Sequence, residues 1–340
     1  MCKANKRKKR QMITIKDVAA EAGVAISTVS KVLNNYPGVS GSTKDKVMSA
    51  VSRLGFTPNT VAAALSSKKS GRIALLMNMG SRTGAIDEIN MQYLSGAIKS
   101  ALEYGLDAVT IFFNMIEDMD LSTLTTYLMS QSIEGIVIFG ISKDDQVLLE
   151  LIESETFKIV VMDAPINNES TSSVWIDHEQ AQVDIIKKTL DGITGNRILY
   201  IAGKQNSYVT ECKLNGVRRI EKELDTTAVV EYGDYSELIA RRITFDRAME
   251  SDLIACGSDL MAIGAMRALM EMDIFKPVCG FDGIKLMAYA GKQMNTVKQD
   301  FAELSRRALE ELKRLLDGGT GTDIKVDYEL VRMRYEDALA

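Results

Sequence analysis

The apolar residues near the start of the chain recur at helical spacing. Between residues 14 and 34, intervals of three and four positions predict two short amphipathic helices joined by a tight turn. The inner face of the first helix would consist of Ile15, Val18, Ala19 and Ala22. Thr14 and Asp17 have the spacing of a capping box, and Gly23 suits the left-handed residue that ends a helix. The inner face of the second helix would consist of Val29, Val32 and Leu33.

The second of these helices would present small and polar side chains to the outside. With its apolar face turned inward, the outward positions are Ile26, Ser27, Ser30 and Lys31. Such side chains suit a helix that enters the major groove of DNA, where they must reach base edges without a clash. A plain helical hairpin with a solvated outer face is the alternative interpretation of the same pattern.

A third helix and a short helical segment follow. Residues 42–54 repeat apolar positions at helical spacing, with Ser42 or Thr43 near the cap and Gly55 at the end. The apolar face would consist of Val47, Met48, Val51 and Leu54. Three short helices enclose a small core, which is consistent with a compact DNA-binding headpiece. Residues 59–65 begin with a capping asparagine and contain three alanines, but they are too few for an isolated helix, so we expect them to fold only against another element.

From residue 72 onward, short apolar runs alternate with amphipathic stretches. Continuous apolar runs are typical of parallel strands that are buried on both faces. The first set comprises residues 73–77, 108–113, 135–139 and 158–162, and the second comprises residues 197–201, 228–231, 252–256 and 278–281. Two such sets predict two doubly wound α/β sheets in succession, and therefore a bilobed body with a cleft between the strand ends.

The charge distribution separates the helical head from the body. Residues 1–72 contain 14 Lys and Arg but 3 Asp and Glu, whereas the remainder contains 27 basic and 43 acidic residues. A basic head on an acidic body indicates that only the head meets a polyanion. The charge run in residues 1–12 predicts a disordered, solvated tail, which could add non-specific attraction to phosphate.

The sequence lacks the residues and motifs that several classes of function require. The four cysteines lie far apart without a C-x-x-C pair, and the single histidine leaves almost nothing for a metal site or a Ser-His-Asp triad. The sequence contains no phosphate-binding P-loop and no G-x-S-x-G elbow, so we expect neither an enzyme nor a cofactor. No apolar run approaches the roughly 20 residues that span a bilayer, and the basic N-terminus is unlike a signal peptide. We therefore expect a cytoplasmic protein without a membrane partner, rather than a transport binding protein.

A resemblance to a known family sharpens this interpretation. Residues 14–34, T-I-K-D-V-A-A-E-A-G-V-A-I-S-T-V-S-K-V-L-N, match the opening motif of the LacI/GalR family of bacterial transcription regulators nearly position by position. The likeness continues through V-S-G-S-T-K-D-K-V-M-S-A-V-S-R-L-G-F-T-P-N-T-V-A-A-A-L and, more loosely, to the C-terminus. It implies an all-α helix-turn-helix headpiece followed by a bilobed, periplasmic-binding-protein-like effector domain. Ala25 departs from the pattern, because the family often places a serine at the start of the recognition helix.

The resemblance implies which residues meet DNA. By their positions in the motif, these would be Thr14, Ile26, Ser27, Thr28, Ser30, Lys31, Asn34, Asn59, Ala62 and Leu65. Residues 59–65 would form the hinge helix of the family, which pairs with its copy in a dimer and enters the minor groove. Leu65 stands where the family places an apolar wedge between base steps. The alternative is a helical linker in which Leu65 packs on the next domain.

The resemblance also implies a division into domains. Residues 1–12 would be the basic tail, 13–56 the helix-turn-helix domain, 57–71 the hinge helix and linker, and 72–340 the effector-binding and dimerisation domain. Because the chain crosses between lobes three times in this family, lobe 1 would comprise about 72–165 and 286–316, and lobe 2 about 166–285 and 317–335. No leucine heptads follow Met333, which favours a homodimer over a tetramer held by a coiled coil.

Polar and aromatic residues stand at the predicted strand ends, where ligands bind in open α/β sheets. Taken singly, such residues are more often helix caps or turn residues. In sugar-responsive members of the family, ligand contacts fall at positions matching Asn78, Asp163, Lys213, Tyr235, Ser258, Asp282, Gln299 and Phe301. Lys213 replaces the arginine of the family pattern, which exchanges a bidentate fork for a point charge. Phe139 stands where some relatives have a sugar-binding asparagine.

The function that follows is that of a sequence-specific transcriptional regulator, in the form of a repressor. It would bind double-stranded operator DNA as a homodimer, with its operator affinity controlled by a small carbohydrate or sugar phosphate in the interlobe cleft. Carboxylates for hydroxyls and an aromatic face for stacking suit a carbohydrate better than a purine, and Lys213 would carry any anionic group. The alternative is a DNA-binding regulator whose body binds a protein co-regulator and whose cleft is vestigial.

Overall fold

The structure is a computed structural model that describes residues 14–33, 38–54, 56, 71–78 and 84–338, except for the side chains of residues 84–87 and 338. Residue contacts divide the chain into two compact units, Met1–Ser70 and Gly71–Ala340. The predicted tail, the predicted hinge helix and Gly55 lie outside the described residues. So do four of the residues implied in DNA contact, which are Asn34, Asn59, Ala62 and Leu65.

The described part of the first unit contains three helices around a small apolar core. They are α1 (Ile15–Ala22), α2 (Ile26–Leu33) and α3 (Gly41–Leu54). The core consists of Val18, Ala19, Val29, Val32, Val47 and Ala50. As the sequence predicts, the Asp17 carboxylate accepts hydrogen bonds from the backbone N–H of Thr14 at 2.7 Å and from its hydroxyl at 2.8 Å. Gly23 ends α1 in the left-handed region, with a φ of 65°.

The third helix differs from the prediction at its start and on its inner face. It begins at Gly41, and Ser40 rather than Ser42 or Thr43 occupies the cap, since the Ser40 hydroxyl accepts from the Thr43 backbone N–H at 3.4 Å. Met48 was expected inside, but its side chain is 52% exposed. The buried stripe follows residues 47, 50, 51 and 54 at three- and four-residue spacing, and position 48 lies beside it.

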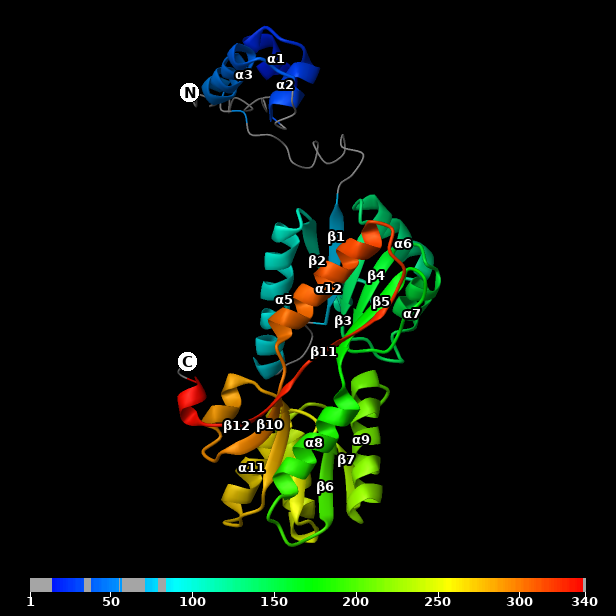
Figure 1. Ribbon diagram of the computed structural model, residues 1–340, viewed down its shortest axis with the longest axis vertical. Helices are drawn as coiled ribbons and strands as arrows, with labels where there is room; N and C mark the ends of the chain where they lie inside the picture. Colours follow the sequence, from blue (N-terminus) through cyan, green and yellow to red (C-terminus); the bar gives the residue numbers. More distant parts are fainter. Residues whose placement is uncertain (1–13, 34–37, 55, 57–70, 79–83, 339–340) are drawn as a thin grey trace, which may run out of the picture. The chain divides into compact units, whose positions relative to one another are not determined.

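Two α/β sheets form the second unit (Figure 1). Within the described residues each sheet has six strands, in the orders β11-β5-β4-β3-β1-β2 and β12-β10-β9-β8-β6-β7. The first sheet comprises β1 (Arg72–Met77), β2 (Asp107–Phe112), β3 (Gly135–Phe139), β4 (Lys158–Met162), β5 (Thr171–Ile176) and β11 (Asp323–Val326). The second comprises β6 (Arg197–Ala202), β7 (Thr227–Tyr232), β8 (Leu253–Cys256), β9 (Val278–Asp282), β10 (Met294–Lys298) and β12 (Glu329–Met333). Described neighbours run parallel, apart from the antiparallel pair of β10 and β12.

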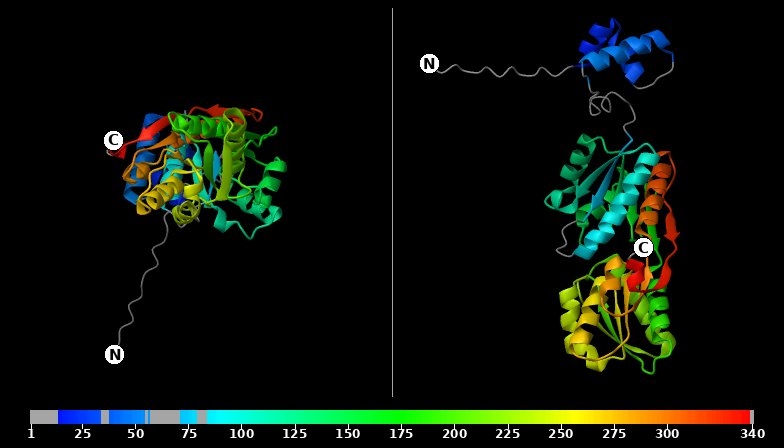
Figure 2. Two further views of the ribbon diagram at one scale, coloured as in Figure 1. Left: turned by 90° about the horizontal axis from the view of Figure 1, so that it is seen from below. Right: turned by 90° about the vertical axis from the view of Figure 1, so that its left-hand side faces the viewer.

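Helices cover both faces of each sheet (Figures 1 and 2). On the first sheet, α5 (Gly84–Glu103) and α12 (Phe301–Leu316) lie side by side on one face, and α6 (Leu121–Ser130) and α7 (Gln146–Glu153) cover the other. On the second sheet, α8 (His178–Leu190) and α9 (Tyr208–Leu224) cover one face, and α10 (Glu237–Arg247) and α11 (Asp259–Glu271) cover the other. Short 3₁₀ helices lie at Phe113–Met115, Ala248–Glu250, Lys285–Tyr289 and Tyr335–Ala338. We call the two sheets with their helices lobe 1 and lobe 2.

Both faces of the central strands are buried, as the apolar runs predict. The prediction is wrong for residues 228–231, because β7 lies at the edge of its sheet and its Val229 and Val230 are 47% and 39% exposed. In β1, Ile73, Leu75 and Met77 belong to the core under α5 and α12. The alternate residues Ala74 and Leu76 belong to the core under α6 and α7. Because side chains of a strand point alternately to opposite faces, a strand that is covered on both sides is typically apolar at successive positions.

The chain crosses between the lobes three times, after β5, after β10 and after β11, as expected. The predicted lobe boundaries are wrong in three places. Strand β5 pairs in the first sheet, although the prediction places residues 166–285 in lobe 2. Strand β10 pairs in the second sheet, although the prediction places residues 286–316 in lobe 1. Strand β11 pairs in the first sheet, although the prediction places residues 317–335 in lobe 2. The boundary strands carry polar residues, and those of β5 are satisfied internally. Ser172 donates to Glu311 of α12 at 2.5 Å, and Ser173 donates to the Ala164 carbonyl at 2.6 Å.

Candidate functional sites on the headpiece and in the interlobe cavity

Helix α2 carries the predicted DNA contacts that the structure describes, apart from Thr14, which caps α1. Ile26 is 45% exposed, Ser27 and Lys31 are also exposed, and Thr28 and Ser30 are half-buried. Val29 and Val32 of the same helix are buried, so the division between inner and outer positions is as expected. The outer face can therefore enter a groove without disturbing the core.

The starts of α1 and α2 differ in how they are capped. Thr14 is exposed, and its hydroxyl donates a hydrogen bond to the Asp17 carboxylate. The hydrogen bond from the Thr14 backbone N–H lowers the pKa of that carboxyl. At α2, the backbone N–H groups of Thr28 and Val29 donate to the Ala25 carbonyl at 2.9 and 3.2 Å. Ala25 has no hydroxyl that could accept from the other backbone N–H groups in the first turn of α2. Those N–H groups are therefore available to a phosphate oxygen.

A cavity of about 660 Å³ lies between the lobes of the second unit. All eight residues implied in effector contact line it, which are Asn78, Asp163, Lys213, Tyr235, Ser258, Asp282, Gln299 and Phe301. Four of them follow or end strands β1, β4, β9 and β10, and Ser258 caps α11, where its hydroxyl accepts from the Met261 N–H at 3.3 Å. The cavity thus lies at the carboxyl ends of the strands, where open α/β sheets bind ligands.

Three of these residues have a left-handed backbone. Asp163 has a φ of 57°, Tyr235 of 58° and Asp282 of 130°. Residues other than glycine adopt such angles at a cost of about 1–3 kcal/mol each, and they cluster at ligand-binding sites. The rest of the fold therefore holds these three side chains in their orientations against local strain.

Asp163 is held by two residues that the sequence did not single out as ligand contacts. Tyr93 of α5 donates to it at 2.8 Å, and His178 Nε2 lies 3.1 Å from its other oxygen. Burial acts to raise the pKa of Asp163, but the bonds from His178 and Tyr93 outweigh it and hold the pKa below its usual value. Burial lowers the pKa of His178, so its imidazole is neutral. His178 follows the end of β5, and recognition of that strand would have revealed it.

Lys213 projects from α9 into the base of the cavity and is 3% exposed. Its ammonium donates to the Gly257 carbonyl at 2.8 Å and lies 3.4 Å from the centroid of the Phe281 ring. Burial lowers the pKa of this ammonium, while Asp282, Asp163 and Asp259 oppose the change. The Lys213 ammonium therefore already interacts with a carbonyl, an aromatic ring and the neighbouring carboxyl groups of the protein.

Two further carboxyls lie near Lys213. Asp282 accepts from Gln299 Nε2 at 3.2 Å, and burial raises its pKa to about 8. Asp259, at the start of α11, accepts from the backbone N–H groups of Gly283 and Ile284 at 2.7 and 2.9 Å. Burial raises its pKa to about 6. Asp259 thus fixes the turn after β9, whereas Asp282 faces the cavity.

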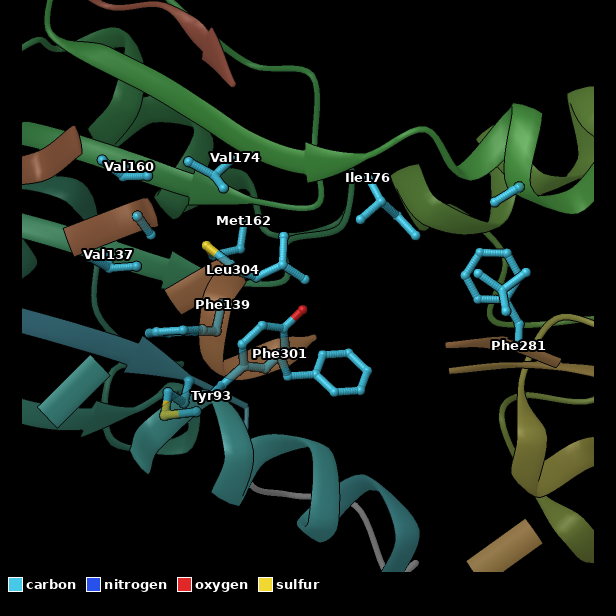
Figure 3. Packing of buried hydrophobic residues seen from close by; sticks show 14 of the residues in the cluster. Tyr93, Val137, Phe139, Val160, Met162, Val174, Ile176, Phe281, Phe301 and Leu304 are labelled. Atoms are coloured by element: carbon cyan, nitrogen blue, oxygen red, sulfur yellow. The ribbon is translucent and has the colours of Figure 1, made fainter. Parts of the chain in front are cut away.

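Aromatic rings form part of the cavity wall. The Tyr93 ring centroid lies 5.2 Å from that of Phe139 and 5.0 Å from that of Phe301. Figure 3 shows these three rings together beyond the ends of the lobe 1 strands, with Phe281 on the side of lobe 2. Tyr235 lies against Gly203, where any Cβ would overlap its ring, and its hydroxyl lies 3.0 Å from the Thr210 hydroxyl.

Polar contacts join the lobes at the cavity mouth, and we call them the interlobe latch. Lys143 of lobe 1 forms an ion pair of 2.6 Å with Glu211 of lobe 2, and its backbone N–H donates to the Asn206 carbonyl at 2.9 Å. Asn206 also donates to Asp144 at 3.1 Å. Ser142 pairs with Ser207 in an isolated antiparallel bridge.

The residues that the structure describes contain no group of three or more His, Cys, Asp or Glu side chains that could hold a metal ion. None of the helices in this part of the chain is long and apolar enough to cross a membrane.

Comparisons with known proteins place this architecture in a family. The family model for bacterial regulatory proteins of the lacI family matches residues 14–59, which include the capped α1 and the exposed face of α2. Catabolite control protein A of Priestia megaterium is 28% identical over 94% of this chain and 96% of its own length. The chain belongs to the LacI family. It is a DNA-binding transcriptional regulator, and the curated relatives are regulators rather than enzymes.

Other relatives of this LacI-family regulator agree over nearly the whole chain. The transcriptional regulator CelR of Thermobifida fusca is 27% identical over 94% of this chain and 97% of its own length. The lac repressor dimer bound to operator and the anti-inducer ONPF has the same fold, with a TM-score of 0.82, 24% identity and coverage of 96% of this chain and 99% of that one. A CelR–cellobiose complex matches with a TM-score of 0.69, 24% identity and coverage of 94% and 99%.

Proposed function

We propose that this regulator is a repressor that binds operator DNA as a homodimer and responds to a small carbohydrate in the interlobe cavity. The observation that carries the proposal is the convergence of eight residues, distant in sequence, on one cavity at the strand ends. A volume of about 660 Å³ lies within the usual range of about 300–1,000 Å³ for small-molecule sites. The structural relatives include a CelR–cellobiose complex and an operator-bound lac repressor dimer.

The cavity offers the contacts that a sugar ring needs. Asp163 is ionised and held by Tyr93 and His178, so its remaining acceptor positions can receive ligand hydroxyls. Phe301 and Tyr235 supply flat apolar surface for the face of the ring. Buried, oriented polar groups of this kind bind strongly because they have already lost their water.

A ligand in this cavity contacts both lobes and can therefore change their relative angle. It does so only if it binds one arrangement more tightly than the other. A hinge segment of seven residues is too short to be helical alone, so its pairing in a dimer would be sensitive to displacement of lobe 1. We expect the ligand to change operator affinity by about 1–3 kcal/mol, the usual range of allosteric coupling.

The alternative is a protein co-regulator acting on a body with a vestigial cleft. A vestigial cleft would be free to fill with apolar side chains and would have no reason to keep strained or buried charged groups. This cavity instead retains Asp163, Asp282 and Lys213 as buried groups whose charges act on one another. These features favour a small ligand.

The test is operator binding by fluorescence anisotropy, with an operator obtained by selection from random duplexes, and with and without a panel of saccharides. Asp163→Ala and Asp282→Ala should abolish the response to the active saccharide while ligand-free operator binding persists. Asp246→Ala on α10 removes an exposed carboxylate outside the cavity and should leave the response intact. If both cavity variants respond like the parent, the cavity assignment is wrong. If no saccharide shifts the parent's operator affinity, the protein co-regulator becomes the better hypothesis.

A further inference from the structure

Carboxylates outnumber ammonium groups among the described residues that line the interlobe cavity. The carboxylates belong to Asp144, Asp145 and Asp163, and the ammonium groups belong to Lys204 and Lys213. Asp282 is a fourth carboxyl group, but burial raises its pKa to about 8, so it is not counted as a negative charge at neutral pH. His178 also lines the cavity, but burial lowers its pKa and leaves it neutral. This balance repels an anionic ligand and attracts a cationic one.

The ammonium at the base of the cavity is not free to meet an anion. Lys213 donates to the Gly257 carbonyl and lies over the Phe281 ring, and the charges of Asp282 and Asp163 act on it from the cavity side. A phosphate placed here would have to displace these partners and approach the Asp163 carboxylate. The expectation that Lys213 carries an anionic group of the ligand is therefore not supported by its contacts.

Two buried polar atoms of cavity-lining side chains have no hydrogen-bond partner in the described part of the chain. They are Gln299 Oε1 and His178 Nδ1, on side chains of residues that are 7% and 2% exposed. Since the ionised Asp163 can only accept, His178 donates to it from Nε2, and its Nδ1 is then an acceptor. Both orphaned atoms are acceptors, so each can receive a hydrogen bond from a donor group of the ligand.

Asp282 is a further acceptor beside Gln299. Burial raises its pKa to about 8, so at neutral pH it holds a proton. The ionisable groups that act on it are Lys213, which opposes the rise, and Asp259 and Asp163, which add to it. Burial retains this proton because it disfavours an uncompensated carboxylate, and a positively charged ligand group beside Asp282 would compensate that charge and so replace the proton.

The aromatic wall suits the same kind of ligand group. Tyr93, Phe139 and Phe301 lie together at the lobe 1 side of the cavity (Figure 3). Aromatic faces attract ammonium groups, and carboxylates nearby strengthen the attraction. Phe139 adds another such face to this wall.

We propose that the effector of this regulator is an amino sugar whose protonated amine lies among Asp282, Gln299 and the aromatic wall. This inference rests on the proposed function and narrows it, since it excludes sugar phosphates. An ammonium group has three donors and no acceptor, which matches a set of unpartnered acceptors better than a hydroxyl does. The ring hydroxyls of the same ligand would then donate to Asp163.

Matched saccharides test the proposal on the unaltered full chain. Isothermal titration calorimetry would compare glucose, glucosamine, N-acetylglucosamine and glucose 6-phosphate, and also cellobiose, chitobiose and N,N′-diacetylchitobiose. Within each set the members differ at carbon 2, or by the phosphate. We expect the amine to bind at least about tenfold more tightly than its hydroxyl and acetamido counterparts, because it adds charge-assisted hydrogen bonds and cation–π contacts. Glucose 6-phosphate should not bind.

A second readout identifies the group that receives the amine. Binding of the amine near neutral pH should release a proton from Asp282, measured by repeating the titration in buffers of different ionisation enthalpy. Asp282→Asn cannot release a proton and should lose both the release and the preference for the amine. Asp246→Asn removes an exposed carboxylate of α10, outside the cavity, and should change neither. Thermal melting of each variant checks that it is folded.

The outcomes separate this inference from the proposed function. Equal or tighter binding of a neutral or phosphorylated member would overturn the amino-sugar inference and leave carbohydrate control of the operator in place. Retention of the amine preference in folded Asp282→Asn would overturn the role given to Asp282. Absence of binding by every saccharide in both sets would overturn the inference and count against the proposed function as well.

Discussion

The outer face of α2 and the interlobe cavity are both lined with polar side chains, but they differ in burial. On α2, Ile26 is 45% exposed and Ser27 and Lys31 are also exposed. In the cavity, the side chain of Asp163 is 14% exposed and Lys213 is 3% exposed. The first surface is in full contact with water before it meets DNA, whereas the second has already lost most of its water on folding.

On α2, substitutions of contact residues should change DNA specificity without changing the stability of the headpiece. In the cavity, substitutions should change ligand specificity and stability together. Exposed side chains on a helix contribute little to folding, so α2 can change its contacts without loss of the headpiece. Buried charges depend on one another, because removing one partner leaves the other without compensation. A substitution in the cavity should therefore alter stability, pH dependence and ligand affinity together.

The largest effect is expected from reversing burial on α2. Val29→Asp places a carboxylate in a core of six buried residues, at a cost of several kcal/mol. That is comparable to the whole stability of so small a module. Operator binding should be lost while saccharide binding by the second unit persists, which NMR amide dispersion and calorimetry would show. Ile26→Asp, three residues earlier on the exposed face, should leave the headpiece folded. Unfolding by both substitutions would contradict the division between the two faces.

The next effect is a pH dependence confined to the cavity. Burial raises the pKa of Asp282 from 3.8 to about 8, so the folded state binds this proton more tightly than the unfolded chain does. Its contribution to the free energy of unfolding is full below pH 3.8 and is lost as the pH rises through about 8. Asp282→Asn cannot ionise and should gain stability relative to the parent across this window, by an amount on the order of a few kcal/mol.

Urea unfolding at several pH values measures this difference, and Asp252 provides the control. Its hydrogen bonds from Arg197 lower its pKa to about 2, so its contribution is present above pH 3.8 and lost as the pH falls through about 2. Asp252→Asn should therefore keep the parent's slope between pH 5 and 8. Equal slopes for the parent and Asp282→Asn in that range would show that Asp282 does not carry the buried proton.

The same contrast explains how much of the molecule the sequence predicts. Helix α2 was recognisable because its period of apolar residues separates inner from outer positions, and eight strands were recognisable as apolar runs. Strands β5 and β10 were missed because they contain buried polar residues such as Ser172 and Thr296. Such residues resemble a loop in sequence, and their partners, Glu311 and Asp259, lie far away along the chain.

The cavity shows the same limit. Asn78, Asp163, Ser258 and Asp282 were found at the ends of predicted strands, and the family resemblance supplied the full set of eight. The structure brings the eight together, although their role as effector contacts stays a prediction. Tyr93 was missed because a tyrosine on an amphipathic helix is indistinguishable from a core residue until its hydroxyl meets Asp163. The pKa of Asp282 depends on the burial and charge of several distant segments, which no local pattern encodes.

A smaller effect is expected from a single exposed contact on α2. If Lys31 reaches a base edge, Lys31→Ala should weaken binding to the preferred operator by about 1–3 kcal/mol and relax the sequence preference at one position. Lys46→Ala removes the same charge from the exposed surface of α3 and should weaken all duplexes to the same small extent. Binding to a library of single-base operator variants distinguishes the two. A uniform loss for Lys31→Ala, with a salt slope reduced by about one, would assign Lys31 to phosphate instead.

The smallest effect should come from the interlobe latch, which combines features of both regions, since it is exposed like α2 but lies at the cavity mouth. Lys143 and Glu211 form an ion pair of 2.6 Å between the lobes, and such exposed pairs contribute little. Lys143→Ala should nevertheless raise the dissociation constant of the effector by a factor of a few at most. The reason is that the arrangement with the lobes closed loses a contact that the arrangement with the lobes open does not have.

Lys187 and Glu223 form a pair of the same 2.6 Å length within lobe 2, so Lys187→Ala should leave effector affinity unchanged. Since high salt screens exposed charges, the difference between the two variants should shrink as salt is added. A difference that persists at high salt would mean that Lys143 acts through its packing on Tyr208, 5.6 Å from the ring centroid, rather than through its charge.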